Sequence, residues 1–102
     1  MTITEIIAHI NKHGGITLKN GEAVQYKSGW QVADYGVEAT TISGMVKAVE
    51  DMKGNCGVWF SEGVYYVDHS FRVSTKKEAL AIGRAHNQIS ILKWSNMSLA
   101  YC

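Results

Sequence analysis

The hydrophobic period of the chain changes several times, and each change predicts a new secondary-structure element. The first segment has isoleucines at helical spacing, namely Ile3, Ile6, Ile7 and Ile10. Thr2 and Glu5 stand at the start of this stripe in the arrangement of a capping box. Gly14 follows it and tolerates the left-handed conformation in which many helices end. The pattern therefore predicts a helix over about residues 3–13.

Turn residues divide the next segment into short strands. Asn20-Gly21 is a strong hairpin signal, because a type I′ turn needs positive φ at both central residues. Residues 27–29, Lys-Ser-Gly, have the composition of a second turn. The two turns predict three strands, near residues 16–18, 22–26 and 30–35.

Helical and extended patterns alternate again in the second half of the chain. After Thr41 the apolar residues return to helical spacing, and Gly54 ends this second helix. A hairpin follows, in which Ser61–Gly63 forms the predicted loop. A second capping box, Thr75–Glu78, starts a third helix that ends near His86. Further strands are predicted at residues 88–93 and, as an optional last element, 97–101.

This order, αβββαββαβ(β), predicts an α+β fold. The length of 102 residues and the absence of repeats, linkers and prolines favour a single domain over residues 1–102. Runs of hairpins between helices favour a mainly antiparallel sheet packed against the helices.

The predicted hairpin register sorts the side chains of residues 56–69 onto two faces. A loop of Ser61–Gly63 pairs Trp59 with Tyr65 and Cys56 with Asp68. One face then carries Cys56, Val58, Phe60, Val64, Tyr66 and Asp68, and the other carries Trp59, Tyr65, Val67 and His69. If the second face is exposed, its aromatic residues form a partner site, whereas helices and loops that cover both faces would make it core.

The same hairpin contains a candidate for thiol chemistry. A histidine can lower the pKa of a cysteine thiol and an aspartate can orient the imidazole, which makes Cys56, Asp68 and His69 a possible catalytic group. The predicted register points His69 away from the other two side chains. A thiol enzyme is therefore the third and least favoured interpretation.

Composition and cysteine content indicate the class of protein. The chain is 46% hydrophobic and 19% charged, as in ordinary globular proteins, and no apolar run has the length of a membrane span. We identify no signal peptide in its first residues. Cys56 and Cys102 form no disulfide framework, so we expect a reducing, cytoplasmic compartment.

The net charge of +1 hides an uneven distribution. Residues 34–68 hold two lysines against six carboxylates, a net charge of −4, whereas residues 72–93 hold five basic residues against one carboxylate, a net charge of +4. The basic residues of the second segment include Arg72, Lys76, Lys77 and Arg84, around the third predicted helix. They form either an ordinary solvated face or a face for an anionic partner such as nucleic acid.

Motifs for cofactors, metals and catalysis are missing from the sequence. It has no glycine-rich phosphate loop and no nucleophile elbow. Glu5, His9 and His13 share one stripe of the first helix, but no further ligand completes a zinc site. We predict no enzyme activity, no cofactor and no bound metal.

The segment from Cys56 to Trp94 resembles small proteins encoded by phages and mobile elements. In them a V-W-x-x-x-G-x-x-Y-V-D hairpin precedes a K-E-A-L-x-I-G-R-x-x-N-Q helix, and both patterns occur here. Anti-CRISPR inhibitors are a prominent class of such proteins, and they are compact α+β domains that block a nuclease complex by binding it. Many inhibitors that mimic DNA are strongly acidic, and the charge of +1 puts mimicry by the whole surface in doubt.

Three functional hypotheses follow. The first is a non-enzymatic protein–protein interaction module, of the phage-borne, anti-CRISPR-like kind, that binds a host protein or ribonucleoprotein such as a CRISPR-Cas effector. The second is a small nucleic-acid-binding domain that uses residues 72–93, and the third is the thiol enzyme. The predicted partner-binding residues are Trp59, Tyr65, His69, Arg72, Lys76, Lys77 and Arg84.

Overall fold

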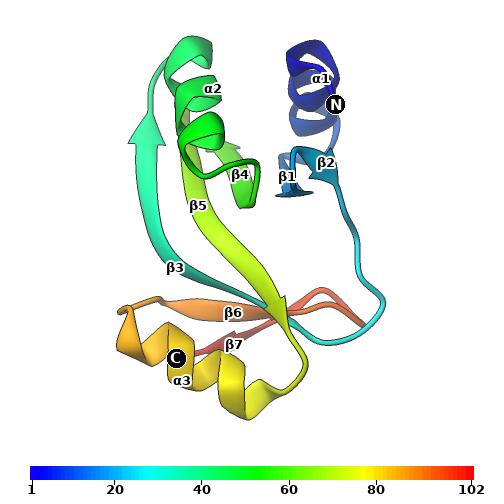
Figure 1. Cartoon of the computed structure of the whole chain (residues 1–102), viewed down its shortest axis with the longest axis vertical. Coiled ribbons are helices and arrows are strands. Elements are labelled where there is room, and N and C mark those ends of the chain that lie inside the picture. Colours follow the sequence, from blue (N-terminus) through cyan, green and yellow to red (C-terminus); the bar gives the residue numbers. More distant parts are fainter. The chain divides into compact units, whose positions relative to one another are not determined.

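The computed structural model describes all residues, Met1–Cys102, as an α+β fold of three helices and seven strands (Figure 1). The helices are α1 (Ile3–His13), α2 (Ile42–Asp51) and α3 (Lys76–Ala85). The strands are β1 (Gly15–Lys19), β2 (Glu22–Ala23), β3 (Trp30–Ala39), β4 (Cys56–Ser61), β5 (Val64–Val73), β6 (Ser90–Lys93) and β7 (Ser98–Tyr101). The fold class and the order of elements predicted from the sequence are confirmed, although β2 is shorter and β3 longer than predicted.

The strands are ordered β2-β1-β4-β5-β3-β6-β7 in the sheet. The residue contacts group into two units. The first unit comprises residues 1–24 and 36–69, and the second comprises residues 25–35 and 70–102. Strands β3 and β5 contribute residues to both.

The two units differ in charge. The first unit has four lysines against seven carboxylates, a net charge of −3. The second has six lysines and arginines against two carboxylates, a net charge of +4. The charge asymmetry of the sequence therefore coincides with the structural division of the chain.

In the first unit, α1 and α2 pack on one face of the sheet formed by β1, β4 and β5 (Figure 1). The predicted capping box is present at the start of α1, where the Thr2 hydroxyl accepts from the Glu5 amide and the Glu5 carboxylate accepts from the Thr2 amide. The buried residues of this core are Ile6, Ile10, Ile16, Leu18, Met45, Ala48, Val49, Met52, Cys56, Val58 and Val67. Alternate positions of β1 and β4 thus face the helices, as the period of a strand requires.

In the second unit, a smaller core lies between α3 and strands β3 and β6. Val32, Ala79 and Ile91 are its buried residues. Hydrogen bonds connect the side chains of Trp94, Gln31 and Ser70 in this unit. Trp94 Nε1 donates to Gln31 Oε1 at 3.1 Å, and Gln31 Nε2 donates to Ser70 Oγ at 3.1 Å. This short chain satisfies the polar groups of the buried Trp94 and Ser70.

The register of the β4–β5 hairpin differs by one residue from the predicted register. Ser61 stays in β4 and pairs with Val64, so the turn has two residues, Glu62 and Gly63, with φ of 50° and 80°. Positive φ at both turn residues is the geometry that matches the twist of two paired strands. The predicted pairing of Trp59 with Tyr65 is therefore wrong, and Trp59 pairs with Tyr66.

None of the three helices combines the length and the apolar character that a membrane crossing requires.

Candidate interaction surface

The first unit has one sheet face that α1 and α2 do not cover, and we call it the open face. In the β4–β5 hairpin it carries Trp59 opposite Tyr66 and Gly57 opposite Asp68. The alternate residues Cys56, Val58 and Val67 lie in the core under the helices. Trp59 is 56% exposed and Tyr66 is 36% exposed, so the open face presents two large aromatic side chains to solvent.

The indole of Trp59 is held in place by a pair of glycines. Gly15 of β1 pairs with Trp59, and a Cβ added at Gly15 would lie only 3.2 Å from Trp59 Cε3. A Cβ added at Gly14 would lie 3.8 Å from Trp59 Cζ3. The ring therefore rests on the glycine backbone, and the amide of Phe60 also donates to the Gly14 carbonyl at 3.1 Å. An exposed aromatic ring supported in this way loses little conformational entropy when a partner binds it.

Asp68 adds a negative charge to the open face. Its carboxylate lies over Gly36 of β3, so that a Cβ added at Gly36 would collide with Asp68 Oδ1. Partial burial raises the pKa of Asp68. Neither the ion pair from the Met1 amino group to Glu22 nor the one from Lys47 to Asp51 includes it. The open face thus combines aromatic residues with a carboxylate that lacks a cationic partner.

Two of the predicted partner-binding residues lie on the other face of the hairpin. Tyr65 packs against the first core, and its ring centroid lies 4.5 Å from that of Phe60. His69 pairs with Cys56 and shares its face. Trp59 is therefore the only one of the three hairpin residues predicted for the site that lies on the open face. Its true neighbour, Tyr66, was missed because the turn was predicted one residue too long.

The arrangement of Cys56, Asp68 and His69 also corrects the sequence analysis. Cys56 pairs with His69 on the helix-covered face, whereas Asp68, opposite Gly57, lies on the open face. The Cys56 side chain is 0% exposed, and burial, with a smaller contribution from the charge of Asp68, raises the pKa of its thiol to about 11. The thiol is therefore protonated and inaccessible at neutral pH, the opposite of an activated nucleophile.

The histidines of α1 make contacts within the first unit. His9 Nδ1 donates to the Gly15 carbonyl at 3.2 Å, and the rings of His9 and His13 lie 4.6 Å apart between centroids. Glu5 accepts the amide of Thr2 in the capping box. No group of three or more His, Cys, Asp or Glu side chains has an arrangement that could hold a metal ion.

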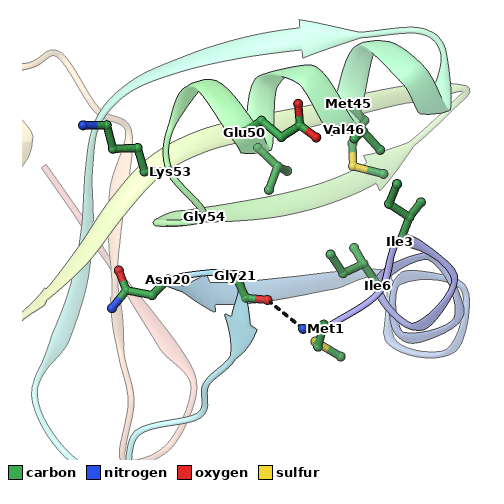
Figure 2. A pocket seen from close by; sticks show the side chains of 11 residues that line it. Met1, Ile3, Ile6, Asn20, Gly21, Met45, Val46, Glu50, Lys53 and Gly54 are labelled. Atoms are coloured by element: carbon green, nitrogen blue, oxygen red, sulfur yellow. Dashed lines mark hydrogen bonds between the residues drawn. The ribbon is translucent and has the colours of Figure 1, made fainter.

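A pocket of about 330 Å³ opens between α1 and α2 in the first unit (Figure 2). Its apolar lining consists of Met1, Ile3, Ile6, Met45, Val46 and Val49. Its polar side chains are Asn20, Glu50 and Lys53, and Figure 2 shows Asn20 and Lys53 extending away from the apolar side chains. The pocket therefore lacks the convergent polar groups that orient a polar ligand in a small-molecule site.

The predicted basic residues lie in the second unit and have different surroundings. Arg72 donates from Nε to the Ser28 carbonyl at 2.9 Å, and its guanidinium lies 5.5 Å from the centroid of Tyr26. Arg84 donates from Nε to the Cys102 carbonyl at 3.3 Å, and Lys77 is exposed. Lys76 lies over Trp30, a contact that the sequence did not indicate.

The comparisons with known proteins give no guide to the interpretation of these surfaces. Comparison with protein-family models, with curated proteins and with solved structures finds no match. The resemblance of residues 56–94 to phage-encoded proteins stays a prediction. The function must therefore be argued from the chemistry of the two units.

Prediction for Cys56. In a Cys102→Ser variant, which leaves Cys56 as the only thiol, iodoacetamide should alkylate the folded protein very slowly at pH 8. The raised pKa means that the thiolate fraction, and with it the rate, keeps increasing up to about pH 11. Mass spectrometry of timed samples measures this rate, and the urea-unfolded protein serves as the accessible control. Rapid alkylation of the folded protein with a plateau below pH 8 would show that Cys56 is an activated thiol after all.

Proposed function

We propose that the protein is a non-enzymatic binding module whose partner surface is the open face of the first unit. The observation that carries the proposal is Trp59, a tryptophan more than half exposed yet supported by the backbone of Gly14 and Gly15. Tryptophan and tyrosine dominate the binding energy of many protein interfaces, because they bury a large rigid area. Trp59 and Tyr66, as cross-strand neighbours, supply two such side chains at one place.

The negative charge of the open face favours a partner with a basic surface. Asp68 stands beside Tyr66 on the same face, and the first unit as a whole has a net charge of −3. A carboxylate without a cation is stabilised when a lysine or arginine of the partner approaches it, and complementary charges also accelerate association. Proteins that handle nucleic acids present basic surfaces of this kind.

This chemistry agrees with the more specific proposal made from the sequence. A module with an aromatic, acidic face is suited to cover the basic surface of a nuclease complex. The resemblance of residues 56–94 to phage-encoded proteins favours a host defence complex, such as a CRISPR-Cas effector in the bacterial cytoplasm, as the partner. In this proposal the inhibitor acts by occupying the surface, so that no catalytic group is needed.

Prediction for the aromatic pair. Trp59→Ala and Tyr66→Ala should each weaken binding to a partner captured from bacterial lysate by about 2 kcal/mol or more, roughly thirtyfold in Kd. Their Tm should change little, because both side chains are exposed. Titration calorimetry of the purified pair measures the affinity, and thermal unfolding measures the Tm.

Tyr65→Ala is the matched control on the opposite face of the same hairpin. It should lower the stability by about 3 kcal/mol, because Tyr65 packs against the core. A partner whose affinity survives both Trp59→Ala and Tyr66→Ala would refute the proposed surface.

Prediction for Asp68. The raised pKa of Asp68 means that its ionisation destabilises the folded state, so stability falls as the pH rises from the unfolded pKa through the folded one. At pH 7 Asp68→Asn removes this cost, and the Tm of the variant should equal or exceed that of the wild type. Partner affinity should fall about tenfold, because a charged hydrogen bond is lost.

Glu62→Gln, at the exposed tip of the same hairpin, changes the net charge equally and serves as the control. A lower Tm for Asp68→Asn together with unchanged affinity would show that Asp68 is a structural residue instead.

A further inference from the structure

We infer that the second unit holds a binding site for single-stranded nucleic acid, in which Trp30 stacks on a base and the two lysines next to it pair with phosphates. The site lies in the unit with a net charge of +4 and shares no residue with the open face of the first unit. It goes beyond the proposed protein partner, and either can fail without the other.

Side chains from β6 and α3 contact Trp30 of β3. The tryptophan stands in β3 and pairs with Lys93 of β6, and the ammonium of Lys93 lies 5.9 Å from the centroid of the indole. Lys76, the first residue of α3, brings a second ammonium to within 5.8 Å of the same centroid. Two cations from separate elements therefore lie over one aromatic ring.

The ring itself is fixed. Trp30 is partly buried and packs against the core formed by Val32, Ala79 and Ile91. A ring held in this way offers a stacking surface at low entropic cost, whereas the long lysine side chains that cover it can move aside. The stacking of one base offsets the loss of an exposed cation–π contact, and a lysine released from the indole gains a phosphate contact, so the exchange is favourable.

The lysines that leave the ring remain within reach of the backbone of a bound strand. Single-stranded nucleic acids are bound by this combination of aromatic platforms and positive charges, and stacking of this kind tolerates any base sequence. A duplex keeps its bases inside the helix, so it can use only the charges of the site. We therefore expect a preference for single strands over duplexes.

The other basic residues of the unit differ from this pair, because Arg72 is the single cation over the Tyr26 ring and Lys27 is exposed. Arg72 is bonded to Ser28 and Arg84 to the carbonyl of Cys102. Lys77 follows Lys76 in the chain and is exposed, but its ammonium contacts no aromatic ring. This difference between two adjacent lysines makes the inference testable.

The experiment measures the binding of a fluorescein-labelled dT decamer to the full chain by anisotropy between 50 and 200 mM salt. Two phosphate contacts on a single strand predict a slope of about −1.4 when the logarithm of the binding constant is plotted against the logarithm of the salt concentration. This slope corresponds to about a sevenfold loss of affinity between 50 and 200 mM salt. Lys76→Gln and Lys93→Gln should each halve the slope, whereas Lys77→Gln should leave it nearly unchanged. Trp30→Phe should retain most of the affinity, and Trp30→Ala should lose about tenfold.

An abasic decamer with the same number of phosphates separates stacking from charge and needs no variant. We expect it to bind about tenfold more weakly than the dT decamer. Equal binding of the two decamers, equal effects of Lys76→Gln and Lys77→Gln, or no binding at 50 mM salt would overturn the inference. Each of these results leaves the protein-binding proposal for the open face intact, because that proposal is tested with Trp59 and Tyr66.

Discussion

The two-residue turn at Glu62 and Gly63 is the constraint on which the arrangement of the first unit depends. Side chains alternate between the faces of a strand, so a shift of one residue would move every side chain of β5 to the other face. With this turn Tyr65 and Val67 face the helices, and Tyr66 and Asp68 face outward. The division between the stabilising face and the candidate binding face therefore follows from a single local geometry.

The chain separates two kinds of surface chemistry. The first unit combines a net negative charge with the pair Trp59 and Tyr66, and the second combines a net positive charge with Trp30 in contact with two lysines. Surfaces of opposite charge in one small protein are suited to a partner that itself contains both protein and nucleic acid. A ribonucleoprotein would satisfy both proposals, since its protein surface is basic where it meets its own nucleic acid and its exposed strands are anionic.

Local signals in the sequence were sufficient to predict the elements, because caps and turns act over a few residues. Thr2, Thr41 and Thr75 each cap a helix, and the order of elements follows from them and from the glycine turns. The register of the β4–β5 hairpin was not predictable in the same way. The sequence Ser61-Glu62-Gly63 fits a three-residue loop as well as it fits a two-residue turn of Glu62 and Gly63. The contact of Trp30 with Lys93 joins β3 to β6 across 63 residues of sequence, so no local pattern reveals it.

The register of the β4–β5 hairpin can be measured directly, and the account of the open face depends on it. Backbone nuclear Overhauser effects between the two strands identify which residues stand opposite each other in solution. We expect contacts that pair Trp59 with Tyr66 and Phe60 with Tyr65. Contacts that pair Trp59 with Tyr65 would place Tyr66 and Asp68 on the helix-covered face and would contradict the account.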